Sequence, residues 1–355
     1  MNKVKLFIPG PVDVSEDVAE VMAKPMIGHR SKAYAELHED TIKKLKKVMY
    51  TENDVFIGPM SSSGWMEAAV RNCVMRKALH VVNGAFSERW YKMSLACNKD
   101  AEALEIPWGS AVRKEQLEDK LNSGEYDVLF ITHNETSTGA MTPLNGIGEL
   151  CRDNDVIFCV DAVSSMGGVK IEVDKLYIDV LVTGTQKCFA VAPGLAMTSV
   201  SERALQRSSE VKDKGYYFDY LIFKKYSQKN NTPSTPPIPQ IYALNYQLEK
   251  ILEKEGLENR FKRHAEMAEY TRKWAKKYLE LYTEEWCSSN TLTCVKNTIG
   301  ADLSLTSTQL LERGYLFSNG YGKLKGQCFR IAHMGDKTLE ELKEYLDTLE
   351  EVLGL

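Results

Sequence analysis

Short apolar runs alternate with helical patterns through the first two-thirds of the chain, and this alternation limits the fold more than any other feature of the sequence. We predict strands over residues 54–58, 79–82, 101–106, 127–132, 156–160, 179–183 and 194–200. Helical patterns lie between them, near 31–49, 62–76, 86–97, 113–122 and 145–153. Strands and helices that alternate in this way form parallel β-α-β units. The sequence therefore predicts an α/β fold with a mainly parallel central sheet that is covered on both faces.

A proline-rich segment separates this region from the rest of the chain. Residues 227–240 contain four prolines and several small polar residues, which predict a stiff extended loop whose simplest role is an interdomain linker. A long helical pattern follows over about 239–281, with a break at Gly256, and then strand 291–296, helix 306–313, strand 327–331 and helix 337–352. We expect a large domain over residues 13–240 and a smaller C-terminal α+β domain over 241–355. Residues 1–12 are expected to be extended and to pack on the small domain.

Composition excludes several classes of protein. The chain of 355 residues has a formal net charge of -4, which gives no electrostatic reason to expect nucleic acid or an anionic membrane as its main partner. No apolar stretch approaches the roughly 20 residues of a membrane span, and the break at Pro9-Gly10 comes too early for a secretory signal. Eight scattered cysteines without a Cys-x-x-Cys pair indicate free thiols in a reducing cytoplasm. No spacing of histidines suggests a metal site.

An acid and a lysine follow two successive predicted strands. Asp161 ends the apolar run 156–160, and Lys187 lies just past 179–183. Ligands bind beyond the carboxyl ends of parallel strands. A lysine amine can form a Schiff base with the aldehyde of pyridoxal 5'-phosphate (PLP), and a carboxylate can keep the pyridine nitrogen protonated so that the ring accepts electrons. A surface lysine, and an Asp161 that caps a helix or binds magnesium, are the alternatives.

Several other strand ends carry residues suited to a planar, phosphorylated cofactor. The small residues Gly58–Gly64 lead into a helix whose N-terminus can bind phosphate, or they simply cap that helix. Phe86 can stack on a ring or belong to the core, and Val163 can lie under the ring. The hydroxyl-rich loop 132–139 can contact the ring oxygen, or it is an ordinary turn. Arg330 lies inside an apolar strand and requires an anion, either a substrate carboxylate or a salt-bridge partner.

Six motifs, in this order along nearly the whole chain, resemble class V aminotransferases. This is the fold-type I PLP family that includes alanine–glyoxylate and serine–pyruvate aminotransferases, with phosphoserine aminotransferase as a near relative. The motifs are Pro9-Gly10-Pro11, Gly28-His29-Arg30-Ser31, residues 132–139, residues 160–168, Gly184-Thr185-Gln186-Lys187 and Phe329-Arg330-Ile331. The resemblance implies the PLP-transferase fold, PLP as cofactor, and a homodimer whose subunits share their active sites.

The resemblance also implies a role for each matching residue. Lys187 is expected to form the Schiff base, and Asp161 to partner the pyridinium. The other expected cofactor contacts are Phe86 and Val163 on the two ring faces, Thr136 near the ring oxygen, Ser62, Ser63 and Gln186 at the phosphate, and Thr235 at the phosphate of the neighbouring subunit. Arg330 is expected to bind the substrate carboxylate. His29 and Arg30 match a pair that binds an anionic substrate side chain in some relatives.

The implied activity is transfer of an amino group from a small amino acid, such as alanine or serine, to a 2-oxo acid such as glyoxylate or pyruvate, in two half-reactions. A phosphoserine or aspartate:2-oxoglutarate aminotransferase is the alternative. A PLP lyase, desulfurase or racemase is a less favoured alternative. Desulfurase chemistry is disfavoured because Gln186 stands where desulfurases carry histidine and no cysteine lies on an evident mobile loop. A non-catalytic or nucleotide-binding α/β protein with a coincidental lysine is the remaining alternative.

Overall fold

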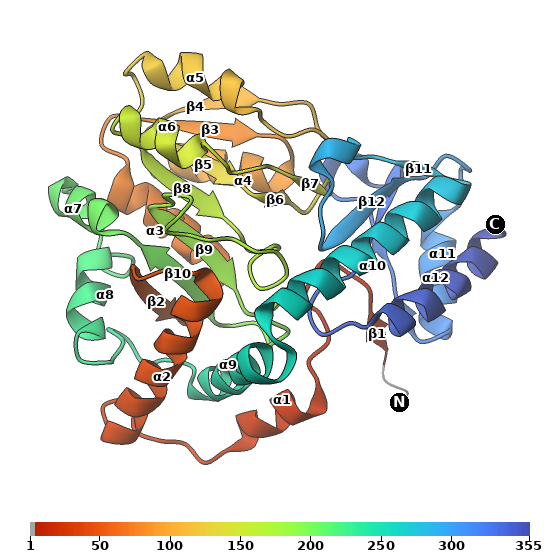
Figure 1. Cartoon of the computed structure of the whole chain (residues 1–355), viewed down its shortest axis with the longest axis horizontal. Coiled ribbons are helices and arrows are strands. Elements are labelled where there is room, and N and C mark those ends of the chain that lie inside the picture. Colours follow the sequence, from red (N-terminus) through yellow and green to blue (C-terminus); the bar gives the residue numbers. More distant parts are fainter. Residues whose placement is uncertain (1–3) are drawn as a thin grey trace.

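The computed structural model describes residues 4–355, and its larger sheet confirms the predicted α/β fold (Figure 1). Seven strands lie in the spatial order β2-β10-β9-β8-β5-β3-β4. Their bounds are β2 Asp54–Gly58, β3 Lys77–Val82, β4 Asp100–Glu105, β5 Val128–Thr132, β8 Ile157–Asp161, β9 Val180–Gly184 and β10 Ala196–Val200. The pairs among β4, β3, β5, β8 and β9 are parallel, whereas β10 is antiparallel to both β9 and β2. The sequence pattern did not predict the antiparallel direction of β10.

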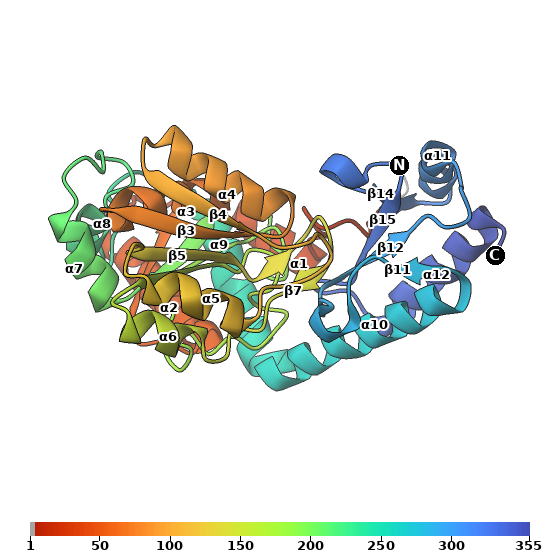
Figure 2. The same cartoon turned by 90° about the horizontal axis from the view of Figure 1, so that it is seen from above.

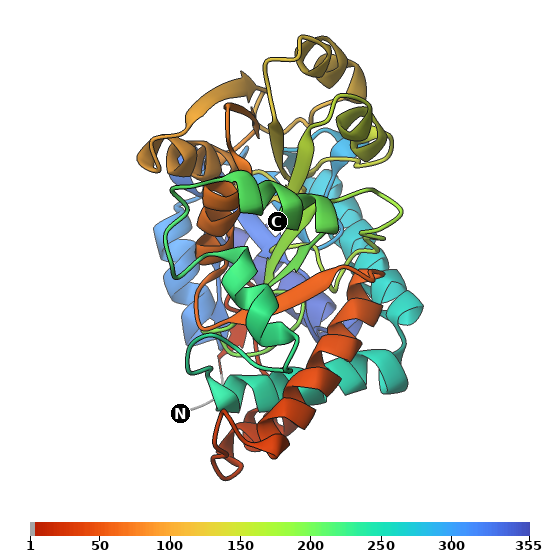
Figure 3. The same ribbon diagram turned by 90° about the vertical axis from the view of Figure 1, so that its left-hand side faces the viewer.

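Both faces of this sheet are buried at its central strands, where successive residues enter different cores. In β8, Phe158 and Val160 pack in one buried cluster, and Ile157 and Cys159 pack in the other. Figures 2 and 3 show helices on both sides of the sheet. The first cluster receives α2 Lys32–Met49, α5 Lys114–Asn122 and α6 Ile147–Asp153, and the second receives α3 Ser62–Cys73, α4 Ala85–Ala96, α7 Glu202–Glu210 and α8 Tyr220–Ser227. Helices α7 and α8, like the short α1 Glu16–Glu20, were not predicted.

A second, antiparallel sheet carries the C-terminal part of the chain. Its order is β11-β12-β15-β14, with β11 Glu280–Leu281, β12 Leu292–Lys296, β15 Cys328–Ala332 and β14 Ser318–Asn319. It packs with α10 Leu257–Tyr278, α11 Leu303–Glu312 and α12 Leu339–Leu353. The N-terminal strand β1 Lys5–Leu6 pairs with β13 Tyr315–Leu316, and Phe7 stacks on Tyr345 with ring centroids 4.2 Å apart. The N-terminal segment therefore lies against this smaller unit.

Helix α9 Ile238–Glu249 packs with the larger unit. Its side chains Ile241, Leu244 and Leu248 are buried in the same cluster as β8 and α2. A π-helical turn at Lys250–Glu255 follows, and Gly256, at φ +80°, is the N-cap of α10. We therefore propose that the domain boundary lies near Gly256 rather than at residue 240. In that case the proline-rich loop joins two parts of the large domain and is not an interdomain linker.

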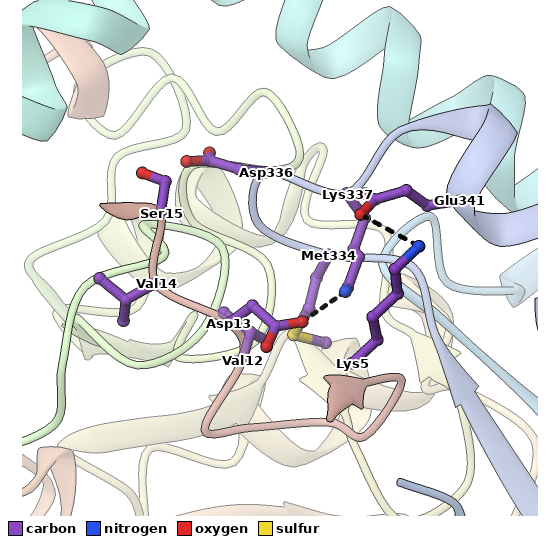
Figure 4. A pocket seen from close by; sticks show the side chains of 9 residues that line it. All are labelled: Lys5, Val12, Asp13, Val14, Ser15, Met334, Asp336, Lys337 and Glu341. Carbon is purple, nitrogen blue, oxygen red and sulfur yellow. Dashed lines mark hydrogen bonds and ion pairs between the residues drawn. The ribbon is translucent and has the colours of Figure 1, made fainter. Parts of the chain in front are cut away.

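Ion pairs tie the N-terminal segment to the start of α12, around a cavity of about 270 Å³ (Figure 4). The buried ammonium of Lys337 donates to Asp13 and lies 4.5 Å from the centre of the Phe7 ring. Lys5 lies 3.9 Å from Glu341 at the same cavity. These contacts help to hold the segment that carries Pro9 and Gly10 in place. None of the helices within residues 4–355 combines the length and apolarity needed to cross a membrane.

Replacing Lys337 with methionine is expected to lower the free energy of unfolding by roughly 1–3 kcal/mol, because it leaves the Asp13 carboxylate without its cation. Lys337 is only 5% exposed, whereas Lys5 is 37% exposed. A Lys5→Met control is therefore expected to cost less than about 1 kcal/mol. Urea unfolding measures both changes. Equal effects of the two substitutions would contradict the buried ion pair as a structural tie.

Candidate active site

A cavity of about 200 Å³ opens at the carboxyl ends of the larger sheet's parallel strands. Its lining residues come from the end of β8 and from the segments that follow β2, β3, β5, β8 and β9, including the N-terminal parts of α3 and α4. They are Ser61, Ser62, Ser63, Met66, Phe86, Arg89, Asn134, Thr136, Asp161, Val163, Ser164, Gln186 and Lys187. Eight residues predicted to contact a cofactor, from positions 62 to 187, thus lie together in one cavity.

Lys187 is buried at this site and is covered by the N-terminal segment. Burial, followed by the charge of Arg330, lowers the pKa of its amine to about 8. Its Nζ donates a hydrogen bond to the carbonyl oxygen of Pro9. Gly10 has φ +105°, and a Cβ there would lie 2.6 Å from Lys187 Cδ. The Pro9-Gly10-Pro11 motif therefore needs glycine where the backbone passes over the lysine.

Asp161 ends β8 and is almost fully buried. Its Oδ1 accepts a hydrogen bond from the backbone N–H of Val163 at 2.9 Å. Burial raises the pKa of its carboxyl to about 7, and the nearby charge of Glu135 adds to the rise. Within the described residues it forms no ion pair. A buried carboxyl in this state is stabilised by a cation or N–H donor placed in the cavity.

The N-terminus of α3 forms the part of the cavity suited to a phosphate. Ser62 Oγ is buried and has no hydrogen-bond partner among residues 4–355. At Gly184, a Cβ would lie 2.3 Å from Ser62 Oγ and 2.8 Å from Gln186 Oε1. Glycine at this position therefore leaves room for both side chains. An unpaired hydroxyl beside free backbone N–H groups at a helix N-terminus is suited to an anion.

Phe86 and Thr136 are held by a hydrogen-bond network beneath the cavity. The buried carboxylate of Glu135 accepts from the backbone N–H groups of Phe86, at 3.1 Å, and Ser87, at 2.9 Å. A Cβ on Gly84 would lie 2.3 Å from Glu135 Cγ, so this approach also needs glycine. Thr136 Oγ1 donates to Ser164 Oγ at 2.9 Å. No individual role for Glu135 or Ser164 was predicted from the sequence.

Arg330 lies in β15 and has no carboxylate partner within the described residues, so the salt-bridge alternative finds no support there. Its Nε and Nη2 donate to the carbonyl oxygen of Asn319, at 3.2 and 3.1 Å, and its Nη1 donates to that of Thr136 at 3.3 Å. A guanidinium has five N–H donors. Each terminal nitrogen therefore keeps one free N–H, which is the arrangement that binds a carboxylate through both oxygens.

Four predicted residues do not line this cavity: Arg330, which borders it through its hydrogen bond to Thr136, and also His29, Arg30 and Thr235. Arg30 donates to the carbonyl oxygens of Thr232, at 2.6 Å, and Pro233, at 3.1 Å, and so anchors the proline-rich loop of its own chain. Thr235 in that loop is exposed, and neither it nor His29 lines the cavity. Their expected roles at cofactor and substrate stay predictions, which a single chain does not test.

The structure adds Arg89 and Asn134 to the residues that sequence analysis had singled out. Arg89 lies one helical turn after Phe86, and the i, i+3 spacing on α4 could have indicated that both face the cavity. Asn134 donates to Ser164 Oγ at 2.8 Å and keeps a buried Oδ1 without a partner among residues 4–355. It lies within the hydroxyl-rich loop, but no sequence signal distinguished it from its neighbours.

The residues present fit pyridoxal 5'-phosphate. An unpaired buried hydroxyl and a helix N-terminus can bind the phosphate, a buried carboxyl without an ion pair can bind the ring nitrogen, and a buried lysine with a lowered pKa can react with the aldehyde. The lining residues come from five different segments at or after the ends of strands. A single molecule that carries a phosphate, an aromatic ring and an aldehyde accounts for all of these binding groups.

Comparison with known proteins agrees with this chemistry. The family model described as aminotransferase class V matches residues 22–317. An uncharacterized aminotransferase of Methanocaldococcus jannaschii is 42% identical over 94% of this chain and 88% of its own length. An L-aspartate–glyoxylate aminotransferase of Paracoccus denitrificans is 32% identical over 94% and 87%. The crystal structure of an alanine–glyoxylate aminotransferase from Nostoc sp. superimposes with a TM-score of 0.95 at 31% identity, over 99% and 96%. The chain therefore belongs to the class V aminotransferase family and uses pyridoxal 5'-phosphate as its cofactor.

Proposed function

We propose that this aminotransferase moves the amino group of a small amino acid, such as alanine or serine, to a 2-oxo acid such as glyoxylate or pyruvate. The observation that carries the proposal is the pair of free N–H groups on Arg330, held by Asn319 and Thr136 beside the cavity that contains Lys187. Both substrates share a carboxylate next to the reacting carbon. Glyoxylate appears in the names of several relatives, the Paracoccus and Nostoc enzymes among them.

In this proposal, each group of the chain has one task. Arg330 binds the substrate carboxylate and so directs the α-carbon toward Lys187. The Lys187 amine, with its pKa near 8, is neutral in a useful fraction near neutral pH and can remove the proton from that α-carbon. The cofactor, when bound, supplies a carbonyl for the amino group and a ring that accepts electrons. Asp161 holds the proton on the ring nitrogen.

The N-terminal segment supports the same reaction by its position. Pro9 accepts a hydrogen bond from the Lys187 amine, and the backbone at Gly10 packs against the lysine side chain. This contact orients the amine and keeps water from one side of it. None of the eight cysteines lines the cavity, which agrees with transamination rather than cysteine desulfuration.

We also propose that two copies of the chain share their active sites and that the protein is cytoplasmic. Thr235 is exposed on a loop that Arg30 anchors, and this presentation suits a contact with a second copy. Eight free cysteines fit a reducing compartment. Sedimentation at micromolar concentration tests the dimer. A shared site predicts that Thr235→Ala weakens cofactor binding without changing the dimer.

Replacing Arg330 with glutamine is expected to lower kcat/KM for alanine with glyoxylate by about 10²-fold, because a desolvated carboxylate loses a charged, two-point contact. Arg330→Lys keeps the charge but not the planar fork, and is expected to recover only part of the loss. Coupled assays with a panel of amino acids and 2-oxo acids measure the effect. Absence of 2-oxo-acid-dependent amino transfer in the wild type would refute the proposed function.

A further inference from the structure

Arg89 is a second guanidinium at the cavity without a carboxylate partner among residues 4–355. It lines the same cavity as Lys187, and its one side-chain hydrogen bond runs from Nη2 to the hydroxyl of Tyr321 at 3.1 Å. Its guanidinium also lies 4.9 Å from the centre of the Phe86 ring. A neutral hydroxyl satisfies one of five N–H donors. Most of the hydrogen-bonding capacity of Arg89 therefore stays free for a ligand.

Tyr321 connects this arginine to the one that binds the substrate carboxylate. Its ring stacks on Phe86 with centroids 5.1 Å apart and an angle of 21° between the planes. The Arg330 guanidinium lies 5.5 Å from the centre of the same ring. One guanidinium thus contacts the hydroxyl of Tyr321 and the other lies over its ring. Tyr321 comes from the smaller unit and is 38% exposed, so it can shift without leaving a buried cavity.

The charges around the cavity leave Arg89 without a task in the reaction of a monocarboxylic substrate. Asp161 is the one carboxylate among the lining residues. The cofactor phosphate is matched by the α3 N-terminus and Ser62, and the substrate α-carboxylate by Arg330. Arg89 is near enough that its charge lowers the pKa of both Asp161 and Lys187. An anion bound at Arg89 would offset the positive charge of its guanidinium, which lies close to Asp161 and Lys187.

We propose that Arg89 binds the second carboxylate of a dicarboxylic substrate, such as the side chain of aspartate, and that the Tyr321 hydroxyl holds Arg89 when no such group is bound. The inference rests on the proposed transaminase function and names a wider class of donors for the same site. Arg330 and Arg89 then bind the two ends of one substrate. Alanine and serine are accepted as well, and with these substrates the Tyr321 hydroxyl takes the place of the second carboxylate as the hydrogen-bond partner of Arg89.

Arg89 is placed better than His29 and Arg30 to bind an anionic side chain within the same subunit, whereas the predicted role of that pair at the substrate stays a prediction. Arg30 already donates to two carbonyl oxygens of the proline-rich loop, and neither residue lines the cavity. Arg89 lines the cavity, and its single side-chain hydrogen bond goes to an uncharged hydroxyl. A dicarboxylate can displace that hydroxyl because a charge-assisted bond is roughly twice as strong as a neutral one.

The test compares kcat/KM for aspartate and for alanine, with glyoxylate as acceptor, in the PLP-loaded enzyme. Arg89→Gln is expected to lower the ratio of the aspartate value to the alanine value by about 30-fold or more, because any effect of its charge on Asp161 and Lys187 is common to both donors. Tyr321→Phe, which removes only the hydroxyl, is expected to leave aspartate within about 3-fold of wild type. Arg152→Gln is the matched control, since Arg152 lies over the Tyr177 ring at 4.1 Å on the surface, and it is expected to change neither donor.

Three results would overturn the inference, and they differ from failure of the proposed function. An equal loss for both donors in Arg89→Gln, with a weaker PLP dissociation constant, would assign Arg89 to the cofactor. An unchanged aspartate value would show that Arg89 binds no substrate. Wild-type enzyme that accepts alanine but not aspartate would refute the inference and leave the proposed function intact. If neither donor is accepted with any 2-oxo acid, both proposals fail.

Discussion

Replacing Lys187 with alanine is expected to reduce kcat by about 10⁴-fold or more, because proton transfer by a positioned base alone contributes about 10²–10⁴-fold and the covalent link to the cofactor is lost as well. The amine is buried and its pKa is lowered to about 8, so it is reactive near neutral pH. Steady-state assays measure the loss. Borohydride reduction followed by peptide mapping is expected to label Lys187 in the wild type and nothing in the variant.

Lys187→Arg is the matched control for this prediction. Arginine keeps a long cationic side chain near Pro9 but has no neutral amine to react with a carbonyl. It is expected to be as inactive as the alanine variant. Turnover retained in either variant, or borohydride labelling at another lysine, would contradict the assignment of Lys187.

Replacing Asp161 with asparagine is expected to lower kcat by about 10²–10³-fold, because the ring nitrogen loses the anion that stabilises its proton. Asparagine keeps the shape of aspartate and can still accept from the Val163 N–H. The loss therefore measures charge more than structure. Steady-state kinetics with saturating PLP give kcat, and Asp161→Glu, which keeps the charge, is expected to retain more activity than Asp161→Asn.

The same substitution is expected to stabilise the apoenzyme at pH 8 by an amount on the order of a few kcal/mol. In the folded apoprotein the pKa of Asp161 is raised from 3.8 to about 7. The folded state therefore keeps a proton that the unfolded state loses, and the contribution of this group to stability falls as pH rises from about 4 to 7. Asparagine removes that cost. Urea unfolding of both apoproteins at pH 4 and pH 8 measures it, and a difference that does not grow with pH would contradict the raised pKa.

The elements of the larger sheet were predictable because their signals are local. Every predicted strand of the first two-thirds corresponds to a strand of the structure, as with 156–160 and β8 Ile157–Asp161. Strands that are buried on both faces are mostly apolar along their whole length, and not only at alternate positions. Helices α7 and α8 were missed. These two helices pack with α3 on one face of the sheet. That packing depends on the order of the elements around the sheet, and the periodicity of the sequence carries no information about that order.

The direction of β10 was another feature that the local pattern did not contain. A short buried segment such as Ala196–Val200 has the same sequence pattern whether it is parallel or antiparallel to its neighbours. Its short connection to β9, through Lys187 and the following loop, leaves no room for a crossover helix. The length of that connection could therefore have indicated the reversal. We propose a boundary near Gly256 for a similar reason, because only packing shows that α9 belongs with α2.

The sequence by itself determined the fold class, the family and the pair Asp161 and Lys187. In a parallel sheet, residues that follow successive strands meet at one edge, so their order along the chain already implies their proximity. Tertiary structure alone decided which distant residues join them. Pro9 contacts Lys187, Thr136 contacts Arg330, and Tyr321 contacts Arg89 across separations of 178, 194 and 232 residues. These contacts depend on how the N-terminal segment and the smaller sheet pack over the larger one, and local periodicity carries no information about that packing.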